Sequence, residues 1–339
     1  HPPAAGWFGW PGPGEPVPVA RAAHHPGGHR AGCALPRQGR VGAYQSGDLN
    51  QYSASPSGLL NLSYRFNEQW SVGFGPTFNH IEGQLTSTIP NPFLPSSAAG
   101  QVKVKGDDFA MGFNAGVLFE LNAATRFGLT YHSKVDYKLK GHTKVESDSL
   151  LAGSAGKYDA SLELQTPESV DFSVTHALDD RWTLYAGSTW TRWSRLQAIT
   201  VDNKGVAGPF AANLTTITEE QGWHDTWAHA VGAAYQLSKQ WVLRAGVAID
   251  QSPTNNTDRS PRIPTGDRTI FSVGMGYAVM DNMTVDLAYS YLKEEKVNVN
   301  RSNALGQTYN AQYDNSANGF GVGATYRFSP SGRGLRPSP

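Results

Sequence analysis

The feature that most constrains this chain is a long stretch, Gly106 to Lys140, in which apolar and polar residues alternate with a period of two. Alternation of this period is typical of a β-strand with one apolar face. Here it continues beyond the length of an ordinary globular strand, passes a turn at residues 122–125 and then resumes. The apolar face of the first strand comprises Phe109, Met111, Phe113, Ala115, Val117, Phe119 and Leu121.

The return segment of this hairpin carries its charges on one parity. One face is predicted to hold Phe127, Leu129, Tyr131, Val135, Tyr137 and Leu139, and the other Arg126, His132, Lys134, Asp136 and Lys138. A Lys or Arg that faces lipid at the membrane midplane costs roughly 2–4 kcal/mol. A strand that turns its cations away from an aromatic face therefore suits a transmembrane β-barrel. An amphipathic hairpin in a soluble β-sandwich is the alternative that this stretch leaves open.

The composition of the 339-residue chain favours a barrel over two soluble domains. Its 37 glycines and its 9 Trp, 14 Tyr and 14 Phe suit strands with small lumen-facing residues and aromatic belts. The sequence has no run of 18 apolar residues, so it predicts no transmembrane helix. A formal net charge of zero argues against a nucleic-acid partner. The single cysteine, Cys33, excludes an intramolecular disulfide and a Cys-rich zinc site.

About eleven strands are predicted between residues 57 and 328, and their connections alternate between short and long. Short periplasmic turns and long extracellular loops in alternation are typical of an outer-membrane barrel. The predicted strands are 58–66, 70–80, 106–121, 126–140, 158–178, 182–196, 222–237, 241–250, 267–279, 283–292 and 316–328. The long polar loops are predicted at 81–105, 141–157, 197–221, 251–266 and 293–315.

Aromatic and proline positions add to this interpretation. Trp70, Trp182 and Trp241 each follow a short turn directly, which predicts an aromatic girdle at the periplasmic end. Capping of hairpin ends by large residues is the alternative explanation. Pro167 cannot donate a ladder hydrogen bond, so it predicts a bulge or a break within 158–178.

The two ends of the chain differ in composition from the strands. Residues 1–45 contain eight of the 21 prolines and four of the ten histidines, and we predict a disordered or misread leader there. His24, His25 and His29 lack a carboxylate or thiolate at a recognisable spacing, so we expect no metal site. Residues 57–328 are predicted to form the barrel and 329–339 a disordered tail.

The sequence gives little support for an enzyme. It contains no phosphate-binding loop, HExxH motif or dinucleotide fingerprint, and the stretch 152–156 only approximates a nucleophile elbow. His132 and Ser133 would point to opposite faces of a strand, which disfavours a lipase unless a bulge intervenes. We therefore expect no catalytic residues and no cofactor.

Several separated motifs together resemble one family. They are LNLSYRFNEQWSVGFGP (60–76), the hairpin at 105–141, WTRWSRL (190–196) and the segment 241–277. In this order and spacing they are similar to the FadL family of outer-membrane transporters for long-chain fatty acids and aromatic hydrocarbons. The resemblance implies a 14-stranded barrel with an N-terminal hatch, passive uptake of hydrophobic ligands and lateral release through the wall. About eleven strands are predicted here, so we expect this chain to lack the hatch and about the first three strands of the family barrel.

This resemblance leads to expectations about site residues and partners. Apolar residues of the predicted 81–105 loop should catch the ligand: Leu85, Ile89, Pro92, Phe93, Leu94 and Pro95. Cations of the predicted lumen face should bind a carboxylate head group: Arg126, Lys134, Lys138 and Arg244. A solvated ladder of these cations with Glu120, Asp136 and Asp250 is the alternative. We expect the protein to be a monomer that crosses the bacterial outer membrane several times. Three other functions remain open: a general diffusion porin, a non-functional remnant of a transporter, and a soluble ligand-binding β protein.

Overall fold

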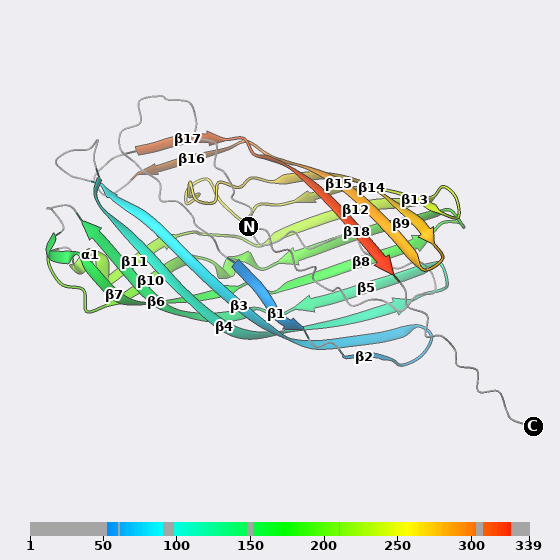
Figure 1. The fold of residues 1–339 in the computed structure, drawn as a ribbon, viewed down its shortest axis with the longest axis horizontal. Helices are drawn as coiled ribbons and strands as arrows, with labels where there is room; N and C mark the ends of the chain where they lie inside the picture. The colour runs from blue at the N-terminus through cyan, green and yellow to red at the C-terminus, as the bar shows by residue number, and fades with distance from the viewer. Residues whose placement is uncertain are drawn as a thin grey trace, which may run out of the picture.

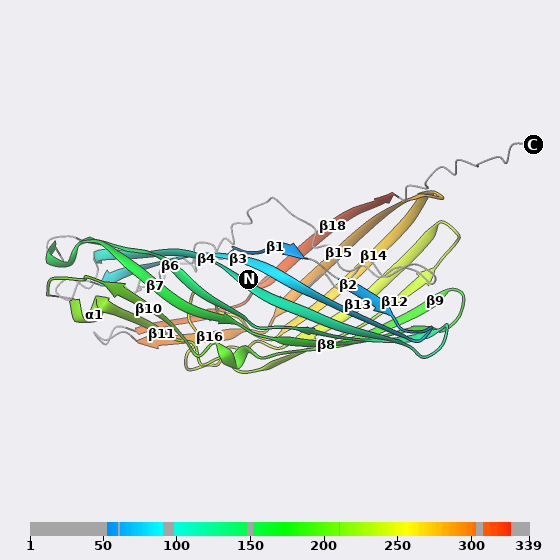
Figure 2. The same cartoon turned by 90° about the horizontal axis from the view of Figure 1, so that it is seen from below.

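The computed structural model describes residues 53–59, 62–90, 98–147, 152–209, 211–302 and 308–326, and these are mostly antiparallel β-strand. Sixteen strands form one curved sheet, and two more form a separate hairpin (Figures 1 and 2). The predicted all-β class is confirmed, and each predicted strand overlaps an observed one. Within the described residues no helix is long and apolar enough to cross a membrane.

The described residues from 53 to 204 form ten strands. They are β1 (Ser53–Leu59), β2 (Leu62–Arg65), β3 (Trp70–Pro90), β4 (Ala98–Glu120), β5 (Thr125–His132), β6 (Val135–Ser147), β7 (Gly156–Thr166), β8 (Ser169–Ala177), β9 (Trp182–Thr191) and β10 (Ala198–Lys204). Short 3₁₀ turns lie at Ala152–Ser154 and Trp193–Arg195.

A short helix, α1 (Ala211–Thr215), follows β10. The strands that follow are β11 (Thr216–Glu220), β12 (Thr226–Gln236), β13 (Trp241–Asp250), β14 (Arg268–Met280), β15 (Met283–Glu294), β16 (Val297–Ser302), β17 (Thr308–Tyr313) and β18 (Ser316–Tyr326). β16 and β17 pair with each other, whereas β18 pairs with β15 in the main sheet.

The predicted aromatic girdle is present at the short-turn end of the sheet. Trp70, Trp182 and Trp241 are the first residues of β3, β9 and β13. Each indole packs against an aromatic ring of the neighbouring strand, with ring centroids 4.5–4.7 Å apart. These rings belong to the outward side of the sheet, which is predicted to face lipid and also exposes Phe74, Phe109, Met111, Leu129, Phe271 and Val273.

Two predicted strands are interrupted at the same level of the main sheet, whose part below the interruptions we call the wall. The segment 126–140 divides into β5 and β6 at Ser133–Lys134, and 158–178 divides into β7 and β8 at Pro167–Glu168. β4 runs unbroken past both breaks, pairing with β6 over residues 100–107 and with β5 over 114–120. Pro167 therefore breaks the strand, as predicted.

The break at Ser133–Lys134 reverses which residues of the return segment face inward. In β5 the even-numbered residues face the lumen, and Leu129 and Tyr131 are exposed outward. In β6 the odd-numbered Val135, Tyr137 and Leu139 are buried on the inner side. The prediction of one continuous face was wrong here. Between the pairs Asn114–His132 and Asp107–Lys140 the return segment has one residue more than β4, and a one-residue shift exchanges the two faces.

Four of the five predicted long loops instead carry strands. β3 and β4 extend through most of 81–105, β6 and β7 through much of 141–157, and β10 and β11 lie within 197–221. The predicted loop 293–315 contains β16 and β17. We call the part formed by β6, β7, β10, β11, α1 and residues 81–90 and 98–107 the extension; it lies at the left end of Figure 1.

The outer end of the extension has its own small core. Val102, Val145 and Leu214 are buried together, so α1 packs on the inner side of the strands. The buried Thr143 hydroxyl donates to Asn203 Oδ1 at 2.5 Å, and Asn203 Nδ2 donates to the Leu214 carbonyl at 2.6 Å. These bonds satisfy polar groups that would otherwise be costly to bury.

The main sheet branches at β4 and has three edges in the part of the chain that the structure describes. β1 and β2 pair only with β3, β11 pairs only with β10, β18 pairs only with β15, and no ladder joins these edges within the described residues. The residues of both β2 and β18 are exposed throughout. The predicted leader 1–45, its histidines and the tail 329–339 lie outside the described residues, so the predicted domain division stays a prediction.

Candidate ligand-binding face

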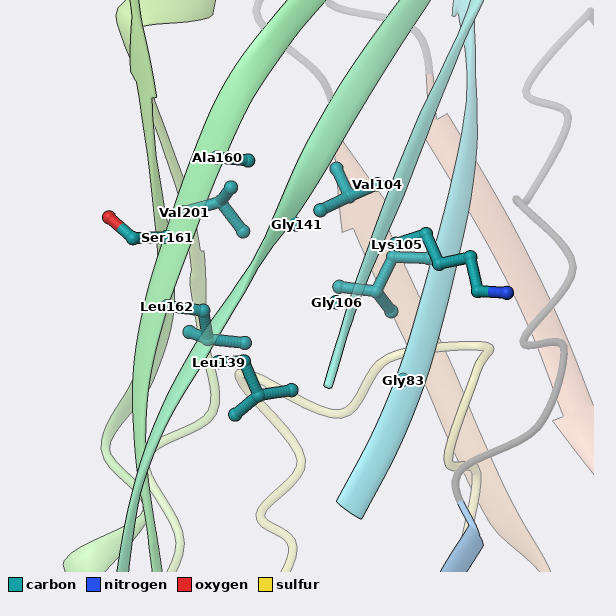
Figure 3. Close-up of a pocket in the computed structure, with 11 residues that line it drawn as sticks. Gly83, Val104, Lys105, Gly106, Leu139, Gly141, Ala160, Ser161, Leu162 and Val201 are labelled. Carbon is teal, nitrogen blue, oxygen red and sulfur yellow. The ribbon is translucent and has the colours of Figure 1, made fainter. Parts of the chain in front are cut away.

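The inner face of the extension carries an apolar pocket. It lies between strands that come from three hairpins, namely β3, β4, β6, β7 and β10 (Figure 3). Its lining residues are Gly83, Leu85, Val104, Lys105, Gly106, Leu139, Gly141, Ala160, Ser161, Leu162 and Val201. Lys105 directs its ammonium group away from the pocket and pairs with Glu82 at 2.9 Å. The remaining surface consists mainly of aliphatic side chains and glycine, which suits an apolar ligand.

A row of three glycines forms part of this pocket. Gly83, Gly106 and Gly141 lie directly opposite one another across β3, β4 and β6. A Cβ atom added at Gly141 would lie 1.8 Å from the carbonyl oxygen of Lys105 and 2.7 Å from Cα of Gly106. The close approach of β4 and β6 therefore requires glycine at position 141.

An apolar cluster continues the pocket toward the rest of the sheet. Ile81, Val135, Tyr137, Leu139 and Leu162 are buried against one another. Ile81 lies two residues from Gly83 on β3, and Leu139 and Leu162 belong to both the pocket and the cluster. Burial, and secondarily the Asp108 carboxylate, raises the pKa of the Tyr137 phenol. The phenol thus remains neutral near pH 7 and the cluster remains uncharged.

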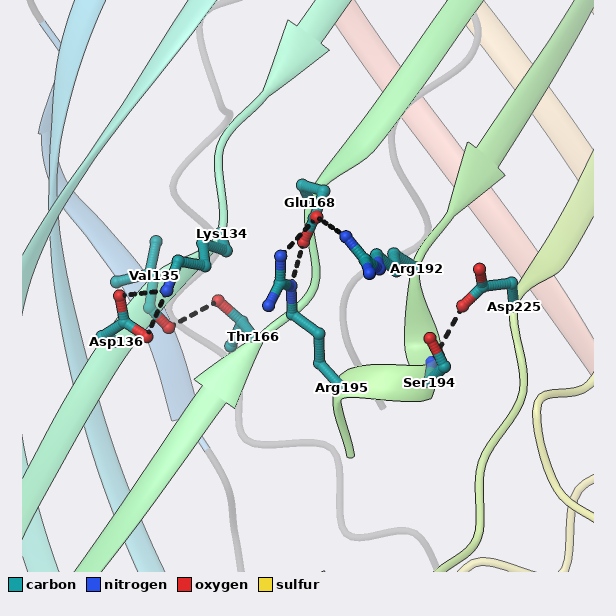
Figure 4. A network of polar contacts seen from close by, with 9 residues as sticks. All are labelled: Lys134, Val135, Asp136, Thr166, Glu168, Arg192, Ser194, Arg195 and Asp225. Carbon is teal, nitrogen blue, oxygen red and sulfur yellow. Dashed lines mark hydrogen bonds and ion pairs between the residues drawn. The ribbon is translucent and has the colours of Figure 1, made fainter. Parts of the chain in front are cut away.

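A buried carboxylate lies at the breaks between the strands. Glu168 is only 6 % exposed and pairs with two arginines from the segment after β9 (Figure 4). Its Oε1 accepts from Arg195 Nη2 at 2.6 Å and from Arg192 Nη1 at 3.2 Å, and its Oε2 accepts from Arg195 Nε. Hydrogen bonding from Arg195, aided by Arg192, lowers the pKa of Glu168 to about 2. Glu168 therefore ties the β7–β8 connection to the β9–β10 connection across the interrupted wall.

The lumen face of β13, β14 and β15 is polar, and its charges are matched. Arg244 pairs with Asp286 at 2.8 Å, and Arg268 pairs with Asp250 at 2.9 Å. Ser272 and Ser290 share a hydrogen bond of 2.7 Å between them. The inner surface thus changes from apolar in the extension to polar in the wall below it.

A family model described as outer membrane protein transport protein (OMPP1/FadL/TodX) matches residues 47–328. The chain belongs to this FadL family. It is therefore a multi-pass β-strand protein of the bacterial outer membrane, and the predicted family, fold class and location are confirmed.

Relatives and solved structures agree with this assignment. Outer membrane protein P1 of Haemophilus influenzae is 34 % identical over 248 residues, which cover 70 % of this chain and 51 % of the relative. The long-chain fatty acid transport protein of an Escherichia coli strain is 28 % identical over 301 residues, covering 79 % and 66 %. The structure of a Pseudomonas aeruginosa FadL homologue has a TM-score of 0.70 at 30 % identity, covering 79 % of this chain and 66 % of that one. The chain thus spans between half and two thirds of the length of these FadL-family proteins.

The predicted capture residues have different positions in this FadL-family chain. Leu85 lines the pocket, but it lies in β3 and not at a loop tip, because the hairpin continues as strand. Ile89 also belongs to β3, and its side chain is outside the described residues. Phe93 and Leu94, with Pro92 and Pro95, lie outside the described residues altogether.

The predicted head-group cations do not form one cluster. Arg126 lies on the lumen face of β5, opposite Glu120 in register, and Arg244 lies on the lumen face of β13. Lys134 lies at the break and pairs with Asp136 at 2.8 Å. Lys138 faces outward: its side chain is 75 % exposed and pairs with Glu163. The prediction that Lys138 faces the lumen was wrong because the parity reverses at Ser133–Lys134.

Sequence reasoning missed most residues of the apolar pocket. Gly106, Gly141, Leu162 and Val201 were not singled out, and Leu139 was assigned to the lipid face. One signal in the sequence could have revealed that the faces of β6 are reversed. Its even positions carry charged residues or histidine from Asp136 to Glu146, and this number of charges is larger than a narrow lumen face would hold.

Proposed function

We propose that this chain captures hydrophobic molecules at the cell surface and guides them passively into its barrel, with long-chain fatty acids or aromatic hydrocarbons as substrates. The observation that carries the proposal is the continuous apolar inner face, which runs from the pocket at Leu85 and Leu162 to the cluster around Tyr137. A water-filled porin has no need of such a face. The relative named a long-chain fatty acid transport protein supports the fatty acid as substrate.

The head group of a fatty acid requires a cation or a hydrogen-bond donor. Among the predicted cations, Arg126 and Arg244 have the lumen position that this role needs, and their contact with a carboxylate remains a prediction. Arg244 already pairs with Asp286, so a carboxylate would have to share or displace that partner. Lys134 has a similar partner in Asp136.

Leu85→Glu is expected to weaken binding of a fluorescent long-chain fatty acid at least tenfold. The substitution removes apolar surface from the pocket and places a negative charge beside an anionic ligand. Gln84→Glu is the matched control, because Gln84 is the adjacent residue of β3 on the opposite face and receives the same charge. Equal losses in both variants would contradict the proposed pocket.

Transport itself is tested by uptake of labelled palmitate and labelled toluene into proteoliposomes without an energy source. We expect saturable uptake that Leu85→Glu reduces and Gln84→Glu does not. Steady, large ion conductance in a planar bilayer would instead favour the general diffusion porin. Binding without uptake would favour a remnant that retains only the capture surface.

A further inference from the structure

The outer face of the extension carries a row of three lysines. Lys103 of β4 lies directly opposite Lys144 of β6, which in turn lies directly opposite Lys157 of β7. All three side chains are exposed on the face opposite to the apolar pocket. We call these three residues the lysine row.

Like charges that lie directly opposite across neighbouring strands repel one another. Lys144 has a carboxylate partner, Glu146, at 2.5 Å. Among the described residues no carboxylate lies within ion-pair distance of Lys103 or Lys157. The hydrogen bond and charge of Lys144, and to a smaller extent the charge of Lys103, lower the pKa of Glu146, so this one carboxylate interacts with two lysines of the row. One carboxylate for three ammonium groups leaves a positive surface that suits an anion with more than one charge.

The next row of residues toward the membrane carries both positive and negative charges. Lys105, His142, Asp159 and Lys204 form the adjacent cross-strand row, and Lys105 is paired with Glu82. The row after it contains Asp107 and Lys140. Positive charge is thus concentrated at the lysine row, with Lys204 beside it, and does not extend over the whole outer face.

The position of the lysine row along β4 places it above the lipid-facing belt. The same outward face of β4 presents Phe109, which is 68 % exposed, six residues from Lys103. Six residues of strand span about 20 Å, and a tilt near 45° reduces this to a height of about 15 Å. Phe119, which packs against the girdle residue Trp70, lies sixteen residues from Lys103 on the same face of β4. By the same geometry Lys103 lies about 37 Å above this girdle, whereas the apolar band of an outer-membrane barrel is about 25 Å tall. The lysine row therefore lies beyond the hydrocarbon edge, at the depth of a large lipid head group.

We propose that the lysine row binds the phosphate groups of phosphorylated glycolipids in the outer leaflet that surrounds the barrel. Flexible lysine stems extend along the outer face toward the membrane and place ammonium groups beside phosphates, which also relieves the repulsion between the opposed charges. Contact with a ring of such lipids holds the extension at a fixed height over the membrane. This surface is separate from the apolar pocket and does not depend on transport.

The experiment compares binding of bis-phosphorylated lipid A and of its dephosphorylated form to the detergent-purified full chain, by native mass spectrometry. The double variant Lys103→Gln/Lys157→Gln removes the two lysines without a carboxylate partner and should bind bis-phosphorylated lipid A at least tenfold more weakly. Lys103→Arg/Lys157→Arg should retain binding. The matched control Arg181→Gln/Lys239→Gln removes two cations from the short-turn end and should bind like the wild type.

Thermal unfolding in lipid-free detergent checks the fold of each variant. Removal of like charges should leave the melting temperature unchanged or raise it, whereas bis-phosphorylated lipid A should stabilise the wild type and not the Lys→Gln variant. Inorganic phosphate at millimolar concentration should not compete with lipid A. Equal binding of both lipid forms, or wild-type binding by Lys103→Gln/Lys157→Gln, would overturn the proposal.

Discussion

Glu168→Gln is expected to lower the free energy of unfolding by about 3 kcal/mol at pH 7. Glutamine has nearly the same shape, but it leaves Arg195 and Arg192 without their anionic partner at a buried position. Removal of one partner of a buried ion pair typically costs 3–5 kcal/mol, and the partial exposure of Arg192 places the expected value at the low end. Urea unfolding in detergent, followed by tryptophan fluorescence, measures the difference.

The pH dependence of the same variant gives a second measurement. The pKa of Glu168 lies at about 2 in the folded protein, below its ordinary value of 4.5. A carboxyl whose folded pKa is lowered stabilises the fold fully above its unfolded pKa and loses that contribution as the pH falls toward the folded value. The wild type should therefore lose up to ~3 kcal/mol between pH 5 and pH 2 through this group, and Glu168→Gln should lack that loss.

Glu163→Gln is the control for Glu168→Gln. Glu163 is a carboxylate of β7, close in sequence, but its side chain is 81 % exposed and its pair with Lys138 is 3.6 Å long. Exposed ion pairs contribute little because solvent screens them, so this variant should unfold like the wild type. If Glu168→Gln and Glu163→Gln unfold alike, Glu168 does not hold the two connections together.

Gly141→Ala is expected to separate β4 from β6 and to cost about 3 kcal/mol of stability, at the upper end of overpacking effects. The added Cβ meets backbone atoms, the carbonyl oxygen of Lys105 and Cα of Gly106, and neither can rotate away. The ladder between residues 100–107 and 140–147 must therefore open. Hydrogen exchange should show faster exchange at the amides of these two segments, and binding of the fluorescent fatty acid should weaken.

Gly116→Ala is the matched control for Gly141→Ala, because Gly116 also lies within a ladder of β4. A Cβ atom there would find its nearest neighbour at 3.6 Å, which is ordinary van der Waals contact. Its exchange rates and fatty acid binding should remain close to those of the wild type. Protected amides in Gly141→Ala would show that the strands tolerate the side chain and that the glycine row does not shape the pocket.

The part of this protein nearest the membrane could be predicted from the sequence. Alternation with a period of two places Phe109 and Met111 outward by local geometry alone, and a tryptophan after a short turn marks the strand start at Trp182 and Trp241. Lipid on one side makes this pattern obligatory, since a misplaced charge there is costly. The strand break at Pro167 could also be predicted, because proline has no backbone N–H to donate to a neighbouring strand.

The candidate site depended on tertiary structure. Leu139 has the same sequence parity as Leu129, yet it is buried inward, because one extra residue at the break near Ser133–Lys134 shifts the register against β4 and exchanges the faces. Beyond the membrane no lipid enforces the pattern, so the extension could continue as strand where polar residues suggested loop.

The pocket combines residues from strands that lie as much as a hundred residues apart or more in the sequence: Leu85, Leu139, Leu162 and Val201. These residues come together because β6 pairs with β4 and with β7, and β7 also pairs with β10. The sequence determined which faces meet lipid, because that choice is local. Only the register of strands distant in sequence decided which residues share the pocket.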